Sequence, residues 1–285
     1  MLPTPDTSHI PTSLVYDPVE DSYLLLDTLS SPSETAFLRS HFLPPAPSPL
    51  SPPSGPSPSP PATRPTHVIP LVVELGSGSG VVSAFLAANA QHVFGGPVLC
   101  ACTDLNPHAC RATVETIQKE LRRKREEERE QKEPRAEGLF MGVCNADLEG
   151  PWVRGNVDVL VFNPPYVPTP QLPSRPDTVR DSLISQEKDR HVGFEEEEYY
   201  LGLAYAGGND GMEVTNRLIE RLPEILSARG CAYIVLCAQN HPEEVKSRLR
   251  GMGVEWRAET VGSSGKKAGW EKLQIMRTWR EFPRQ

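Results

Sequence analysis

The chain has 285 residues, 30 of them proline, and a formal net charge of −8 at pH 7. A negative surface repels phosphate, so direct nucleic-acid binding is not expected. Because no run of about 18 apolar residues occurs and the N-terminus has no apolar signal core, we predict neither a membrane span nor secretion, and we expect the protein in the cytoplasm or the nucleus.

The first 66 residues divide into two parts. Residues 1–43 are predicted to form an N-terminal helical segment packing over the ligand site of the domain that follows, with an amphipathic stretch at 12–30 that Asp17 or Asp21 could cap. Residues 44–66 hold 11 of the 30 prolines. Such a segment can build neither a helix nor a sheet ladder, so a disordered insert is predicted there.

Residues 67–285 alternate between strand and helix patterns, which predicts an α/β domain. Strands are predicted at 67–75, 98–103, 139–143, 157–162, 231–237, 254–260 and 273–278. Helices are predicted at 79–90, 106–132, 210–226 (with Gly230 as its C-terminal cap) and 242–250. Right-handed crossovers then give a seven-stranded, mostly parallel sheet with helices on both faces, and the last two strands form an antiparallel pair at one edge.

A glycine-rich loop follows the first predicted strand. Gly76, Gly78 and Gly80 alternate with serines, the first of which is Ser77. Glycines allow a sharp turn and a close approach to a ligand. Glu74 stands just before the loop, where it can attract a cationic amino-acid group, and the loop lacks the Gly-Lys-Ser/Thr ending of a P-loop. These features favour S-adenosylmethionine, with a dinucleotide as the alternative ligand.

Acidic residues also end the next two strands. Asp104 and Leu105 follow the second strand, where a carboxylate is placed to accept hydrogen bonds from ribose hydroxyls. A helix cap at Asp104 or Asn106 is the alternative, and the two roles are compatible if Asn106 caps while Asp104 binds. Asp147 and Leu148 follow the third strand. That pair could accept an adenine amino group and pack against its ring, although polar residues are ordinary in a turn.

The fourth strand runs directly into Asn163, Pro164, Pro165 and Tyr166. An amide or aryl amine nitrogen is a poor nucleophile, so an enzyme that methylates it must hold both N–H bonds. The Asn163 side-chain oxygen and the Pro164 carbonyl are suitable acceptors, and Pro165 restricts the direction of that carbonyl. Tyr166 supplies an aromatic face. The alternative is a strand ended by a proline turn.

These motifs resemble those of the HemK-type branch of class I methyltransferases. The resemblance rests on Glu74–Gly80, Thr103–Pro107 and Asn163–Tyr166. Two further segments, Val15–Ser22 and Ala206–Gly211, are similar to the eukaryotic release-factor glutamine methyltransferases. The family has a Rossmann-like fold, which agrees with the α/β pattern.

The resemblance implies a catalytic subunit that methylates the glutamine of a Gly-Gly-Gln motif in the eukaryotic class-1 release factor, together with a small zinc-binding activator protein. It implies catalytic roles for the four residues at 163–166. It implies cofactor contacts by Tyr16, Ser22, Glu74, Gly76, Ser77, Gly78, Gly80, Asp104, Leu105, Asp147, Leu148 and Asn163. Methylation of a protein lysine or of adenine N6 in nucleic acid are the alternatives.

The six cysteines contain no Cys-x2-Cys pair. Buried reduced thiols are the favoured interpretation, and a zinc site or a disulfide is the alternative. They are Cys100, Cys102, Cys110, Cys144, Cys231 and Cys237.

Overall fold

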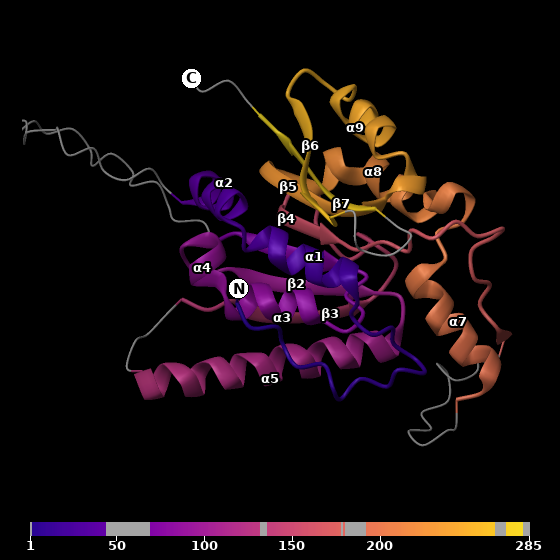
Figure 1. The fold of residues 1–285 in the computed structure, drawn as a ribbon, viewed down its shortest axis with the longest axis horizontal. Coiled ribbons are helices and arrows are strands. Elements are labelled where there is room, and N and C mark those ends of the chain that lie inside the picture. Colours follow the sequence, from indigo (N-terminus) through magenta and orange to yellow (C-terminus); the bar gives the residue numbers. More distant parts are fainter. Residues whose placement is uncertain are drawn as a thin grey trace, which may run out of the picture.

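Seven strands form one sheet in the computed structural model, in the order β3-β2-β1-β4-β5-β7-β6 (Figure 1). The structure describes residues 2–43, 69–131, 136–177, 179, 192–265 and 272–281, so the predicted insert at 44–66 lies outside the described residues. The strands are β1 (Leu71–Leu75), β2 (Leu99–Asp104), β3 (Leu139–Asn145), β4 (Val157–Phe162), β5 (Leu226–Cys237), β6 (Trp256–Ser263) and β7 (Leu273–Arg280).

Strand direction agrees with the prediction from sequence. β1, β2, β3, β4 and β5 pair in parallel, whereas β7 lies antiparallel to both β5 and β6. The short connection between the last two strands explains the antiparallel pair, because a parallel neighbour needs a longer crossover. The α/β fold with a mostly parallel seven-stranded sheet is confirmed.

Helices cover both faces of the sheet because the central strands are buried on both sides. Alternate strand residues enter two separate cores, one containing Val72 and Tyr233 and the other Val73 and Ile234. The first core packs against α1 (Glu20–Leu29), α2 (Pro32–Phe42), α3 (Val81–Ala88), α4 (Ala90–Phe94) and part of α5 (Pro107–Gln131). The second packs against α8 (Glu213–Ile225) and α9 (Pro242–Arg250). Two-sided burial of this kind is what continuous apolar strands require.

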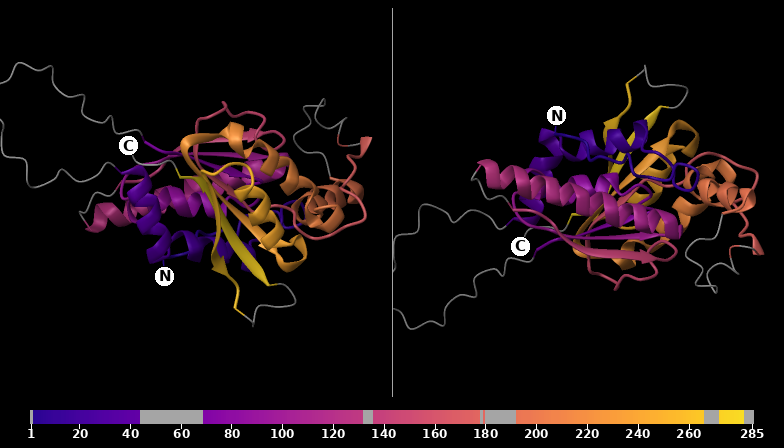
Figure 2. Two further views of the ribbon diagram at one scale, coloured as in Figure 1. Left: turned by 90° about the horizontal axis from the view of Figure 1, so that it is seen from above. Right: turned by 90° about the horizontal axis from the view of Figure 1, so that it is seen from below.

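The N-terminal segment contains a helix within the predicted amphipathic stretch, but its cap differs from the prediction. Helix α1 begins at Glu20 with Val19 as its N-cap and without a side-chain capping bond, so neither Asp17 nor Asp21 caps it. The chain before α1 lies along α5 (Figure 2). Val15 packs there among alanines of α5, and the Leu14 carbonyl accepts a 2.7 Å hydrogen bond from the Asn106 side chain.

Two further elements were not predicted correctly. Helix α7 (Phe194–Tyr205), at one end of the molecule in Figure 1, had no counterpart in the predicted helices. Helix α8 ends at Ile225, so Gly230 is not its cap and lies within β5. A Cβ at Gly230 would come within 2.7 Å of the Val157 carbonyl oxygen, so the glycine permits the close approach of β4 and β5. None of the described helices is long and apolar enough to cross a membrane.

Candidate active site

A cavity of about 300 Å³ opens at the carboxyl ends of the central strands. Ligands of open α/β sheets bind at this edge. The cavity brings together most of the residues singled out from the sequence: Tyr16, Ser22, Glu74, Gly76, Ser77, Gly78, Asp104, Leu105, Asp147, Leu148, Asn163, Pro165 and Tyr166. Gly80 and Pro164 are not among the residues that line it.

The glycine-rich loop turns through positive φ angles at Gly76 (60°), Gly78 (52°) and Gly80 (77°). Residues with a Cβ rarely adopt these backbone angles, which explains why the sequence has glycine at these three positions. The Gly76 N–H is tied to the Thr103 carbonyl at 2.8 Å, so the loop is held against the end of β2. A Cβ at Gly80 would lie 2.6 Å from the Thr113 Cα, so Gly80 serves the packing of the loop against α5.

Two buried carboxylates line the cavity beside this loop. Glu74 is 3% exposed, and one of its oxygens accepts the Ser83 N–H at 2.9 Å and a short hydrogen bond from the Ser83 hydroxyl. Burial raises the pKa of Glu74 to about 8, against the opposing effect of these hydrogen bonds. The two oxygens of Asp104 accept the N–H groups of Gly78 and Asn106, each at 2.8 Å. Burial raises the pKa of Asp104 to about 6.

Such carboxylates suit a ligand that carries both positive charge and hydroxyl groups. A cation beside Glu74 would favour the ionised form of that carboxyl group. The Asp104 carboxylate lines the cavity, and its two oxygens together carry about four lone pairs, so it can accept a ligand hydroxyl group in addition to main-chain N–H groups. The predicted capping of the next helix falls to the Asn106 side chain, which accepts the His108 N–H at 2.8 Å.

The loop after β3 adds a polar and an apolar group. Asp147 forms an ion pair with Arg217 of α8 at 2.5 Å, a partner that the sequence patterns did not reveal. Leu148 is 9% exposed and has a φ of 46°, an unusual angle for a leucine. This geometry turns the chain sharply at the edge of the cavity.

The tetrapeptide after β4 contributes an unpaired acceptor. The Oδ1 atom of Asn163 is buried and has no hydrogen-bond partner among the described residues. Buried polar atoms in proteins are nearly always paired, and Asn163 is among the residues that line the cavity, so this oxygen is a candidate acceptor for a donor on a ligand. Pro164 is buried beneath this surface, whereas Pro165 and Tyr166 line the cavity.

Two residues that hold the tetrapeptide were missed by sequence reasoning. The Tyr166 hydroxyl donates to Asp21 of α1 at 3.1 Å, although Asp21 was considered only as a helix cap. Asn240 donates from its side chain to the Tyr166 carbonyl at 2.9 Å. A signal for Asn240 did exist, since it is a polar residue just after β5, at the carboxyl edge of the sheet.

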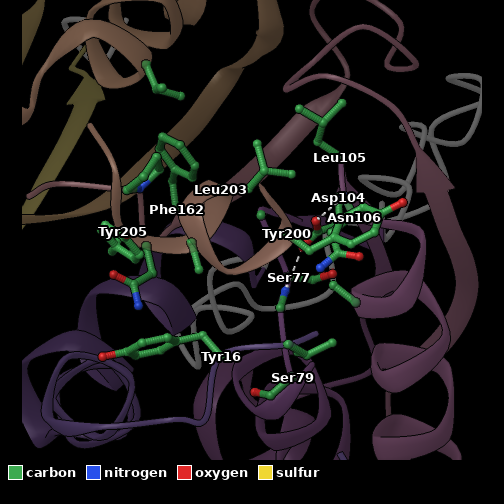
Figure 3. A pocket seen from close by; sticks show the side chains of 18 of the residues that line it. Tyr16, Ser77, Ser79, Asp104, Leu105, Asn106, Phe162, Tyr200, Leu203 and Tyr205 are labelled. Carbon is green, nitrogen blue, oxygen red and sulfur yellow. Dashed lines mark hydrogen bonds between the residues drawn. The ribbon is translucent and has the colours of Figure 1, made fainter. Parts of the chain in front are cut away.

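Helix α7 supplies the remaining wall of the cavity. Five residues of this helix line the cavity: Tyr199, Tyr200, Leu203, Ala204 and Tyr205. In Figure 3, Tyr205 lies beside Phe162 at one end of the cavity, whereas Tyr200 lies near Asp104 and Asn106 at the other. The cavity therefore has one end at the tetrapeptide and another at the carboxylate that ends β2.

All six cysteines are free thiols, and no group of three or more metal-binding side chains occurs among the described residues. Cys110 and Cys144 are half-buried and the other four are buried. The disulfide alternative is therefore wrong for this structure.

The fold and this site define a class I methyltransferase. No family model matches the chain. It is 31% identical over 279 residues to Methyltransferase HEMK2 of Mus musculus. The aligned region covers 97% of this chain and 96% of that protein. The chain belongs to this family of methyltransferases, for which S-adenosylmethionine is the methyl donor.

Two other relatives carry more specific names. The eRF1 methyltransferase catalytic subunit mtq2 of Schizosaccharomyces pombe is 29% identical over 98% of this chain and 96% of that protein. The release factor glutamine methyltransferase of Bradyrhizobium diazoefficiens is 34% identical over 97 residues, which are 34% of this chain and 27% of that protein.

Proposed function

We propose that this enzyme methylates the N5 nitrogen of the glutamine side chain in the Gly-Gly-Gln motif of a eukaryotic class-1 release factor. The observation that carries the proposal is the buried, unpartnered Oδ1 of Asn163 at one end of the cavity. The names of the fission yeast and bacterial relatives support the choice of substrate. Because translation termination occurs in the cytoplasm, the proposal places the enzyme there, and a nuclear fraction is compatible with it.

The chemistry assigns roles to Asn163, Pro164 and Tyr166. S-adenosylmethionine supplies a methyl group on a positively charged sulfur: the new N–C bond forms as the S–C bond breaks, S-adenosylhomocysteine leaves as a neutral thioether, and the amide nitrogen gives up one proton to solvent. The Asn163 oxygen accepts one N–H of the glutamine amide, and the Pro164 carbonyl is the proposed acceptor for the other. Tyr166 packs its ring against the planar amide. Holding both N–H bonds directs the nitrogen lone pair toward the methyl group, so positioning provides most of the rate enhancement.

The cofactor is proposed to lie between the glycine-rich loop and the N-terminal segment. Gly76, Ser77 and Gly78 bring the main chain close to it, and Gly80 supports the loop from behind. Glu74 faces its amino-acid group. The other proposed contacts are made by residues that line the cavity: Asp104 and Leu105 at the ribose, Asp147 and Leu148 at the adenine, and Tyr16, Ser22 and Asn163 near the sulfonium.

A second subunit is part of the proposal, because the fission yeast relative is named as a catalytic subunit. We propose a small zinc-binding activator protein. The outer strand β3 offers exposed apolar side chains, with Leu139 64% and Met141 61% exposed. Apolar side chains on an edge strand are typical of a surface that another chain covers.

The test is to co-express the chain with the candidate activator and to incubate the purified complex with release factor and labelled S-adenosylmethionine. We expect label on the intact release factor and none on a variant whose motif glutamine is replaced by alanine. Lysine-containing histone substrates and adenine-containing DNA oligomers serve as controls. Label on one of these controls, with an unlabelled release factor, would overturn the proposal.

A further inference from the structure

The N-terminal helix reaches the tetrapeptide through one buried carboxylate. Asp21, in the first turn of α1, is 7% exposed, and its Oδ2 atom accepts the Tyr166 hydroxyl at 3.1 Å. The two residues are 145 positions apart in the sequence. Both line the cavity. A buried carboxylate needs hydrogen bonds to offset its loss of hydration, and this hydroxyl provides one of them.

We infer that Asp21 is a positioning residue for methyl transfer, acting through the Tyr166 hydroxyl to fix the ring; the inference rests on the function proposed above. The carboxylate is itself fixed, since its Oδ1 atom accepts the Ser22 N–H at 2.5 Å and the Ser22 hydroxyl at 3.1 Å. Its other oxygen is thereby directed at Tyr166. A hydrogen bond to an ionised group is stronger than one between neutral groups.

The main chain of Tyr166 is fixed independently, by residues other than Asp21. Its carbonyl accepts the Asn240 side chain at 2.9 Å, and a Cβ at Gly211 would come within 2.0 Å of the same oxygen. The main chain of the tetrapeptide is therefore set by contacts from the sheet and the loop before α8. Those contacts act on the main chain. The Tyr166 side chain packs against the first core, and the bond between its hydroxyl and Asp21 fixes the outer end of the ring.

Asp21 is not explained by helix capping alone. The N-cap of α1 is Val19, which makes no side-chain capping bond, and both Glu20 and Asp21 stand in the acidic first turn. An acidic residue there stabilises the helix dipole at either position. Only Asp21 contacts Tyr166, and Glu20 is exposed. Glu20→Ala is therefore a matched control for the contribution of Asp21 to helix stability.

The test is a double-mutant cycle of Asp21→Ala and Tyr166→Phe in the complex with its activator. Misplacement of a group at the reacting centre typically lowers the rate by about 10- to 100-fold. We expect Asp21→Ala to lower kcat within that range in the wild-type background and by less than about twofold when Phe occupies position 166. Glu20→Ala should keep kcat, and Asp21→Asn, which keeps an acceptor oxygen, should lose less than Asp21→Ala.

Additive losses in the two backgrounds, or an equal loss with Glu20→Ala, would overturn the inference. Thermal unfolding of the same four proteins measures the coupling without any substrate. If the wild-type enzyme does not methylate release factor, the proposed function fails, and the unfolding cycle still decides whether Asp21 and Tyr166 are coupled. If Asp21→Ala does not fold, Asp21→Leu, which has a similar shape and no acceptor oxygen, completes the cycle.

Discussion

Replacing Asn163 by alanine should separate catalysis from stability. The side chain has a buried oxygen without a partner among the described residues, so its removal takes no hydrogen bond away from the folded protein. An unsatisfied buried acceptor costs about 1–3 kcal/mol in desolvation. The free energy of unfolding should therefore stay within about 1 kcal/mol of the wild-type value, or rise.

The effect on turnover should be large. One preorganised hydrogen-bonding group at a reacting centre is typically worth about 10²–10³ in kcat, or roughly 2.7–4 kcal/mol. Steady-state transfer of labelled methyl to release factor measures kcat, and denaturant unfolding of the same preparations measures stability. Asn163→Asp, which keeps the shape and an acceptor oxygen, should have a kcat at least about tenfold higher than that of Asn163→Ala. Unchanged turnover in Asn163→Ala, or equal losses in both variants, would refute the role of the oxygen as an acceptor.

Three other changes test the surroundings of the site. Gly211 has a φ of 67°, and a Cβ there would lie 2.0 Å from a main-chain carbonyl oxygen of the tetrapeptide, so Gly211→Ala should lower kcat at least about tenfold. Gly155 has a φ of 73° with nothing within 4 Å of its Cβ position, so Gly155→Ala should keep kcat. Equal effects of the two changes in the methyl-transfer assay would contradict this packing. With a pKa of about 8, Glu74 is mostly protonated at pH 7, so binding of the cationic cofactor should release a proton and strengthen as the pH rises from about 6 to 8. Titration calorimetry in buffers of different ionisation enthalpy should detect that proton in the wild type and not in Glu74→Gln, and a wild type without buffer dependence would count against it. The buried guanidinium of Arg277 lies 2.6 Å from the Glu34 carboxylate. Glu34→Ala removes that partner and should lower the free energy of unfolding by about 3 kcal/mol. A loss below about 1 kcal/mol in urea unfolding would contradict this estimate.

Long-range packing explains the errors in the sequence-based predictions. Asp17 and Asp21 are residue types that often cap helices, but α1 begins at Glu20 with Val19 as its N-cap, and Asp21 instead accepts the Tyr166 hydroxyl. Glycine is a common helix cap, but Gly230 lies within β5, where the absence of a side chain allows the close approach of Val157. Helix α7 has an acidic first turn and a poorly segregated apolar face, so periodicity gave no signal for it.

The sequence by itself determined the sheet, the glycine-rich loop, the carboxylates at the strand ends and the tetrapeptide. These features are local: a buried parallel strand is a continuous apolar run, and the residues that follow it must lie at the ligand-binding edge. Only the tertiary structure decided which distant side chains complete the site. Asp21 contacts Tyr166 across 145 residues, and Arg217 contacts Asp147 across 70. No local pattern predicts such pairs, since they depend on how helices from both ends of the chain pack against one sheet.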